Sequence, residues 1–506
     1  NTYIRYLESE IVTVGLSPLS YTSYELYNNE SYSFQQAFNV NSRQLLYSKV
    51  TSRHYLTNTI SEVQNEFDLY GNIISQTNTL MEDSVSQWMT KLTSSSFSDA
   101  GSFYPNKPQI LLHEKSNLSL ASSHFSESRL EFNSNGILIQ RKDNFNYPDY
   151  TTIKEYEYND FGNLVKSKIS GRLNQSIDTI AESFTYDSKG RFLTKSINPE
   201  GHVATFTNIP STGQVASQTS PNGLLTQYYY NSLGTLLKSK DALGNEVSHK
   251  SLWYQGTEIE HAVFYKESTS NSGTVYQFFN NSGQTLRSVS HGFNSILAAD
   301  NEYNNKGQLI KSSFPYHENN TPSEFTEYNY DYYGRIISTI SPTRTLNYSY
   351  DGLKTIEYDV ILDMSSYSLS DAAGNVVEVG DVAGNKLYYS YTDLGLVDRI
   401  EVKDASNNLL SATTMAYDSV GRQTQLNDPN AGTTTYDYNA FGMLLSQTDA
   451  NQNTFNYTYD KLGRVLTAND GNTENYSYTY DQSANGIGKL TSLVGTNGYQ
   501  LHHQYD

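Results

Sequence analysis

The sequence predicts an all-β protein in which an array of β-hairpins forms one long spiralling sheet, shaped as a shell, a cocoon or a barrel. Two observations carry this prediction. Tyr-Asp or Tyr-Asn pairs recur every 21 residues, starting at Tyr417, Tyr438, Tyr459 and Tyr480, and a fixed period indicates a repeated supersecondary unit. The chain of 506 residues also contains 44 Tyr, 20 Phe and 32 Gly, a composition typical of short strands joined by tight turns.

One copy of the repeat, residues 455–466, shows how the unit folds. Aromatic side chains at alternate positions, from Phe455 to Tyr459, lie on one face of a strand. Asp460 can accept hydrogen bonds from backbone amides two residues on, and Gly463 supplies the positive φ of a tight turn. A second turn signal falls between units, as at residues 449–453. Each period is therefore one strand, turn, strand and turn.

An isolated hairpin is marginally stable in water, so each must pair with its neighbours. A long sheet with the native twist coils instead of staying flat. We therefore expect a tube or a hollow shell, and the sequence leaves open whether its centre is filled. The clearest copies of the repeat share a structural signature of Tyr, Asp, Gly and Arg, at Tyr186, Asp187, Gly190, Arg191, Tyr417, Asp418, Gly421, Arg422, Tyr438, Gly442, Tyr459, Asp460, Gly463, Arg464, Tyr480 and Asp481.

Along the chain, residues 1–60 form an irregular β-rich lead-in, and residues 61–506 form the repeat region. The repeat is weak at 76–128 and at 250–300. Between Thr79 and Leu92, a capping-box pattern and apolar residues at helical spacing permit a short helix, but a strand through Trp88 fits equally well. The chain ends on another pair, Tyr505-Asp506, and we expect it to be a segment of a longer protein.

Charge and composition exclude several classes of function. A formal net charge of −19 argues against binding to nucleic acid, because that affinity depends on clustered Lys and Arg. Without cysteine there are no disulfides, thiolate metal sites or Cys nucleophiles. No apolar run is long enough for a membrane span, and the N-terminus has no basic-then-apolar pattern of a secretory signal.

No catalytic, cofactor-binding or metal-binding residues emerge from the sequence. Strings such as 241–245 resemble calcium loops, but each supplies one carboxylate before its glycine, so turn chemistry is the better account. His502 and His503 point to opposite faces of a regular strand and cannot both chelate one metal. The Arg residues after the turn glycines either bond to neighbouring hairpins or are solvated. Tyrosines at every second position indicate a packed face more than a sugar-binding one.

The units resemble those of the RHS/YD-repeat family, in which an aromatic-Asp pair, two variable residues and Gly-Arg or Gly-Asn precede an apolar residue. Residues 186–191, 417–422 and 459–464 carry this pattern, and recognisable copies cover roughly residues 60–506. The resemblance implies a β-shell like those of the Tc toxin B and C components, of bacterial polymorphic Rhs toxins and of the teneurin barrel. Such shells enclose a toxic C-terminal domain or present a surface for adhesion.

One departure limits what the resemblance implies. Family members that release cargo carry an aspartyl autoprotease segment with Asp-Pro-x-Gly, which is absent here. The nearest string, residues 428–432, has its Gly one place late, and we interpret it as a turn between repeats.

The expected function is a non-enzymatic shell segment of a larger secreted or toxin-delivery protein of bacterial origin, with a role in virulence. Its partner would be an enclosed toxin polypeptide or a neighbouring shell component. The alternative is a cell-surface adhesion or glycan-binding protein that contacts glycans or a receptor.

Overall fold

The computed structural model describes residues 9–14, 17–26, 47–68, 72–97, 107–174, 176–292, 295–471 and 474–506. Across these residues the fold is all-β, as predicted, and consists of one antiparallel sheet of 41 strands. A single 3-10 turn, η1 (Pro148–Tyr150), is the helical element of the described part.

The strands before η1 are long, most of them between 8 and 13 residues. They are β1 (Ser9–Val14), β2 (Ser17–Leu26), β3 (Tyr47–His54), β4 (Thr59–Phe67), β5 (Ile73–Glu82), β6 (Val85–Phe97), β7 (Pro108–Asn117), β8 (Ser122–Phe132) and β9 (Leu138–Asp143).

The strands after η1 are shorter, because turn signals recur at closer spacing in the repeat. The first group is β10 (Thr152–Tyr158), β11 (Leu164–Arg172), β12 (Ile177–Tyr186), β13 (Leu193–Ile197), β14 (Val203–Asn208), β15 (Val215–Thr219), β16 (Leu225–Tyr230), β17 (Leu236–Lys240), β18 (Glu246–Trp253), β19 (Phe264–Ser270), β20 (Gly273–Phe279), β21 (Thr285–Gly292), β22 (Ser295–Tyr303), β23 (Leu309–Ser313), β24 (Tyr316–His317) and β25 (Phe325–Tyr330).

The last group contains the most regular repeats. It is β26 (Ile336–Ile340), β27 (Thr345–Asp351), β28 (Lys354–Asp359), β29 (Met364–Ser370), β30 (Val376–Asp381), β31 (Lys386–Tyr391), β32 (Val397–Lys403), β33 (Leu409–Tyr417), β34 (Gln423–Asp428), β35 (Gly432–Tyr438), β36 (Leu444–Thr448), β37 (Thr454–Tyr459), β38 (Val465–Asn469), β39 (Asn475–Tyr480), β40 (Leu490–Gly495) and β41 (Gln500–His502).

The topology is a meander in which each strand pairs with the next along the chain. Around the two-residue strand β24 the order changes, because β22 pairs with both β23 and β24, and β23 pairs with β25. The register shifts at the same place in many repeats, immediately before the signature tyrosine, as at Tyr417, Tyr459 and Tyr480. A β-bulge increases local twist, so a bulge in repeat after repeat favours a sheet that coils.

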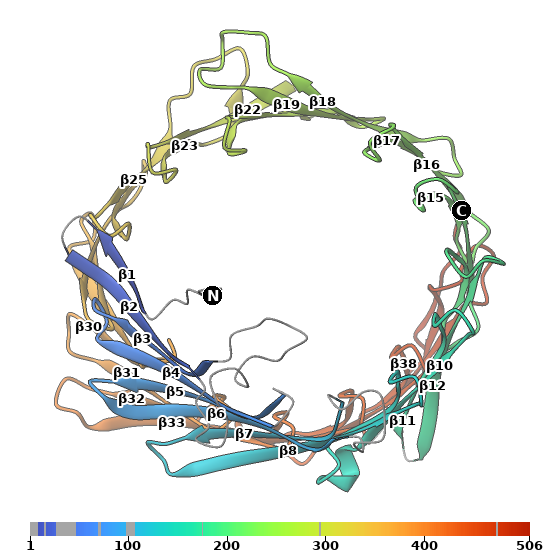
Figure 1. Ribbon diagram of the computed structural model, residues 1–506, viewed down its shortest axis with the longest axis horizontal. Coiled ribbons are helices and arrows are strands. Elements are labelled where there is room, and N and C mark those ends of the chain that lie inside the picture. Colours follow the sequence, from blue (N-terminus) through green and yellow to red (C-terminus); the bar gives the residue numbers. More distant parts are fainter. Residues whose placement is uncertain are drawn as a thin grey trace, which may run out of the picture.

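The coiled sheet runs around a ring and then overlaps itself (Figure 1). Hydrogen bonds join residues between 261 and 285 positions apart in the sequence, which places the late strands β30–β41 beside the early ones. The wall is therefore one strand layer thick and, over part of its circumference, two stacked turns high.

A wall of this kind has little core. The buried apolar side chains of the described residues are few, namely Phe67, Leu173, Phe279, Val289, Ala298 and Tyr459. The accessible surface is 30,045 Å², whereas a compact protein of this mass exposes about 19,000 Å². Both faces of the sheet are consequently open to solvent over most of its length.

Between Thr79 and Leu92 the structure selects the strand over the helix. β5 and β6 form a long hairpin there, and Trp88 pairs with Leu80 in its register. The division at residue 60 into lead-in and repeat region stays a prediction. Residues 1–8, 15–16 and 27–46 of the lead-in lie outside the described residues.

Candidate functional site

The hairpin turns along one edge of the sheet, here called the YD edge, share one geometry. In the turn 418–422, the Asp418 carboxylate accepts hydrogen bonds from the backbone amides of Val420 and Arg422, at 3.0 and 2.9 Å. Gly421 completes the turn with φ +87°, a conformation that favours glycine. Asp187 and Asp460 accept backbone hydrogen bonds four residues on in the same way. These carboxylates are thus engaged within their own turns.

The tyrosine that precedes each turn ties its hairpin to the previous one. Its hydroxyl donates to a backbone carbonyl 14 to 21 residues earlier, at 2.6 to 3.1 Å, for the pairs Tyr158–Leu138, Tyr230–Val215, Tyr303–Thr285, Tyr330–Leu309, Tyr350–Ile336, Tyr391–Val376, Tyr417–Val397, Tyr459–Leu444, Tyr480–Val465 and Tyr505–Leu490. Burial raises the pKa of Tyr417 and Tyr459, so the hydroxyl remains a donor at neutral pH.

The residue after the turn glycine extends this connection along the YD edge. Arg422 donates to the carbonyl of Asn439 in the next YD turn, and Arg464 forms a two-pronged ion pair with Asp481, at 2.9 and 2.7 Å. Arg191 bonds within its own turn, to Asp187. The expected bond to a neighbouring hairpin is therefore present for Arg422 and Arg464, whereas the half-exposed Arg191 is ion-paired within its own turn. In four repeats the residue is an amide that donates to the glycine carbonyl of the next YD turn, in the pairs Asn163–Gly190, Gln214–Gly234, Gln284–Gly307 and Gln308–Gly334.

The candidate functional site is the line along which the two turns of the wall meet, which we call the seam. It joins the YD edge of the second turn to the opposite edge of the first turn, which carries the turns between repeats. The seam residues are Gln87, Trp88, Asn117, Arg172, Leu173, Asn174, Asp178, Glu200, His202 and Asn222 on the first turn, and Asp371, Ala372, Tyr391, Asp437, Tyr438, Asn439, Ala440, Tyr459, Lys461, Asp481 and Ile487 on the second.

Asn439 lies at the centre of the seam and is fully buried. Its Nδ2 donates to the carbonyl of Leu173 at 2.6 Å, while its Oδ1 accepts from the amides of Phe441 and Met443. An aspartate at this position would satisfy the turn amides but would have no proton for Leu173. The Asn in the Tyr438-Asn439 pair is therefore suited to contact between turns of the wall, although Asn also occupies this turn position at Asn231 and Asn280, away from the seam.

Two asparagines of the first turn bind the second turn through its backbone. Asn174 donates to the carbonyl and accepts from the amide of Tyr459, at 3.3 and 3.2 Å. Asn222 does the same with Ile487, at 2.9 and 2.8 Å. Each asparagine side chain thus satisfies one backbone amide and one backbone carbonyl of the second turn of the wall, at a point where no described strand of the first turn pairs with them.

Trp88 and Gln87 form the corresponding contact at the start of the seam. The indole Nε1 of Trp88 donates to Oδ2 of Asp371 at 2.7 Å, and the amide of Ala372 donates to Oε1 of Gln87 at 2.9 Å. Asp371 is buried, and Asn375 also donates to its Oδ2. A hydrogen bond to a buried carboxylate is among the stronger ones in proteins.

Charged groups meet at the far end of the seam. Nε2 of His202 lies 3.2 Å from Oδ2 of Asp481. Arg464 donates one hydrogen bond to each carboxylate oxygen of Asp481. The Arg464 guanidinium is the main cause that lowers the pKa of Asp481, with smaller contributions from the Gly488 amide and His202. Asp481 is therefore ionised at neutral pH. It links two neighbouring repeats of the second turn of the wall through Arg464 and contacts the first turn of the wall through His202.

Several signature residues thus lie at the seam, whereas others, including Asp187 and Arg191, lie away from it. The first-turn partners were not singled out by sequence reasoning, because Asn174 and Asn222 read as ordinary turn residues.

The other candidates from the sequence have turn geometry. Asp241 accepts from the amides of Leu243 and Asn245, and Asp428 accepts from those of Asn430 and Ala431 in the turn between β34 and β35. The described residues contain no group of three potential metal ligands. Nor does any helix in the described part have the length and apolar character to cross a membrane.

Comparisons with known proteins agree with this architecture. Residues 355–474 match the family described as Teneurin YD-shell. The crystal structure of TcdB2-TccC3 aligns over 96% of this chain and 32% of its own length, with TM-score 0.56 and 11% identity. The form without the hypervariable C-terminal region aligns over 96% and 34%, with TM-score 0.58 and 11% identity. No curated protein matches the sequence.

The resemblance to RHS/YD-repeat proteins is thereby confirmed, and the likeness to the Tc toxin structures is one of fold. The chain spans about a third of the length of those structures.

Proposed function

We propose that this chain is a non-enzymatic wall segment of a hollow YD-repeat shell, which encloses and shields a polypeptide cargo. The cargo is a toxic domain carried in the same precursor or on a partner chain, and the whole protein is secreted from, or displayed on, a bacterial cell. The proposal rests on the seam, because it holds a one-layer sheet as a ring that overlaps itself over part of its circumference.

The small core and large surface support this proposal. A protein that is stable with both faces of its sheet open to solvent has an inner face available for contact with another polypeptide. The likeness in fold to TcdB2-TccC3 is a second support. The net charge of −19 favours a basic cargo through electrostatic attraction.

Small-angle X-ray scattering of the full chain tests whether the wall is hollow. A filled globule of 506 residues has a radius of gyration of about 23 Å. We expect a clearly larger radius and a pair-distance distribution shifted to long distances, as a hollow ring gives. A radius near that of the globule contradicts the proposal.

Protease protection tests enclosure itself. The longer natural protein is digested as wild type and with Asn439→Asp, which weakens the seam. We expect the cargo to survive in the wild type and to be cleaved in the variant. Cleavage of the cargo at equal rates in both proteins rules out shielding by this wall.

A further inference from the structure

Three neighbouring strands, β18 to β20, present an ordered surface on one face of the sheet. Their register places Trp253, Phe264 and Phe279 in one row, Ser251, Lys266 and Gln277 in the next, and His249, Ser268 and Val275 in the third. In the first row the rings of Phe264 and Phe279 stack at 4.9 Å, and Trp253 is 72% exposed. An aromatic row thus lies beside a row of hydrogen-bonding groups.

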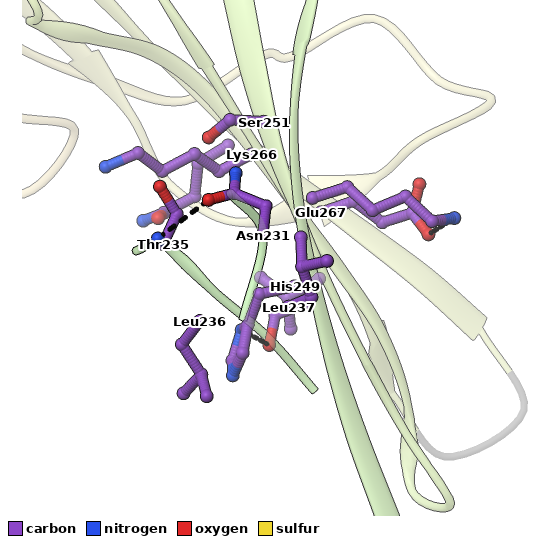
Figure 2. A pocket seen from close by; sticks show the side chains of 12 residues that line it. Asn231, Thr235, Leu236, Leu237, His249, Ser251, Lys266 and Glu267 are labelled. Atoms are coloured by element: carbon purple, nitrogen blue, oxygen red, sulfur yellow. Dashed lines mark hydrogen bonds and ion pairs between the residues drawn. The ribbon is translucent and has the colours of Figure 1, made fainter. Parts of the chain in front are cut away.

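A groove of about 380 Å³ crosses this face, which is within the size range of small-molecule sites. The polar row lines it together with His249, and Leu237 and Val275 contribute apolar surface. Figure 2 shows Lys266 and Ser251 on the same side of the strands as Asn231 and Thr235 of the adjoining turn. Nδ1 of His249 lies 3.2 Å from the hydroxyl of Ser268, which fixes the ring at the groove floor.

The charge of Lys266 is not neutralised on this face. Its cross-strand partners are Ser251 and Gln277, and its ammonium group lies 5.3 Å from the ring centre of Phe279. Among the described residues no carboxylate forms an ion pair with it. Lys250 and Glu267 also line the groove, but they neutralise each other in an ion pair at 2.8 Å, and Figure 2 shows Glu267 on the other side of the strands from Lys266.

We propose that this groove binds a sugar that carries a carboxylate, such as a uronic or a sialic acid. The Lys266 ammonium forms the ion pair with the carboxylate. The hydroxyl of Ser251 and the amide of Gln277 bond the ring hydroxyls, and Leu237 and Val275 contact the apolar face of the ring. Trp253 offers an exposed aromatic ring for a second sugar in a chain. This site is independent of the shell function proposed above.

The test is isothermal titration calorimetry of the full chain with oligosaccharides that end in glucuronic acid or N-acetylneuraminic acid, and with the glucose-ended analogue. We expect the acidic sugars alone to bind. Lys266→Met should weaken that binding at least tenfold. The matched control Lys354→Met, a lysine that likewise lies over an aromatic ring but outside the groove, should leave it unchanged. Ser251→Ala combined with Gln277→Ala tests the neutral contacts without altering charge, and we expect a several-fold loss.

Three outcomes overturn the proposal. One is equal binding of the acidic and the neutral sugars. Another is equal affinity in the Lys266→Met and Lys354→Met variants. The third is displacement by inorganic phosphate or acetate at the same concentrations as free glucuronic acid, which would make the groove a general anion site. Circular dichroism of each variant verifies the fold, which these exposed positions should not disturb.

Discussion

Two arcs of the same wall use the same repeat in different surroundings. In the stacked arc, where β30–β41 lie on the first turn, the turn residues Asp371, Asn439 and Asp460 are buried. In the single arc, β17–β28, the described residues make no hydrogen bond to another turn of the wall, and the buried turn residue Asp359 is paired with Arg344 of the same arc. Local turn chemistry is therefore common to the repeat, whereas hydrogen bonds between turns of the wall depend on the position along the spiral.

This difference shows what each residue of the signature contributes. Aspartate or asparagine closes its own turn in both arcs, as Asp331 and Asp371 do through amides two and four residues on. At the seam, the side chain of this residue also bonds a partner on the other turn of the wall, as Asp371 does with Trp88. Substitutions that preserve the hydrogen bonds of the hairpin turn and remove the partner on the other turn of the wall should therefore destabilise the stacked arc but not the single arc.

The largest effect is expected for Asn439→Asp. The change keeps the turn acceptor but places a carboxylate against the carbonyl of Leu173 in a fully buried site, at a cost of about 4 kcal/mol in the free energy of unfolding. The matched control is Asn231→Asp, whose Oδ1 likewise accepts from two turn amides and which should cost little. Urea denaturation measures both, and similar losses in the two variants would remove the distinction between the arcs.

Trp88→Phe should have the next largest effect. It preserves an aromatic ring and removes the indole donor to the buried Asp371, and we expect a loss of about 2 kcal/mol. Trp253→Phe is the control in the single arc, because Trp253 is 72% exposed. A thermal melt that shifts equally in both variants would show that the contact from Trp88 adds no stability.

Substitutions of turn glycines should lower the free energy of unfolding equally in the two arcs, because they affect only the backbone of the hairpin turn. Gly442 and Gly244 have φ values of +88° and +87°, and a Cβ on either would meet no atom within 4 Å. We expect Gly442→Ala and Gly244→Ala each to cost about 1 kcal/mol, the penalty of a side chain in the left-handed region. Denaturation midpoints that differ widely between the two variants would contradict this view.

The smallest effect concerns acid. Because Arg464 lowers the pKa of Asp481 in the folded state, the carboxylate stabilises the seam above its unfolded pKa of 3.8 and loses this contribution as pH falls through the lowered value. Asp481→Asn should cost less than about 1 kcal/mol at pH 7 and flatten the loss of stability below pH about 4. An unchanged acid profile in melts of the variant would exclude this role.

The fold was predictable because its determinants are local and repeat. The spacing from Tyr417 to Tyr480, the turn glycines and the alternating aromatic residues are enough to define hairpins in a continuous sheet. Between Thr79 and Leu92 local patterns conflicted, and the strand prevailed because β5 and β6 complete each other's hydrogen bonds and those of their neighbours.

The seam was not predictable because its contacts span 261 to 285 residues, and the period along the chain does not say which turns will stack. Asn174 and Asn222 have the composition of any turn in this protein. Their contacts with Tyr459 and Ile487 depend on the twist that accumulates along the sheet.

Disulfide cross-linking tests the central claim, that the second turn rests on the first in this register. The chain has no cysteine, and a Cβ on Gly171 would lie 2.9 Å from that of Ala440, so shifts of roughly 1 Å reach disulfide geometry. We predict that Gly171→Cys with Ala440→Cys cross-links on oxidation, as read by peptide mass spectrometry, and that Gly171→Cys with Ala405→Cys does not. No cross-link in the first pair, or equal cross-linking in both, would contradict the stacked wall.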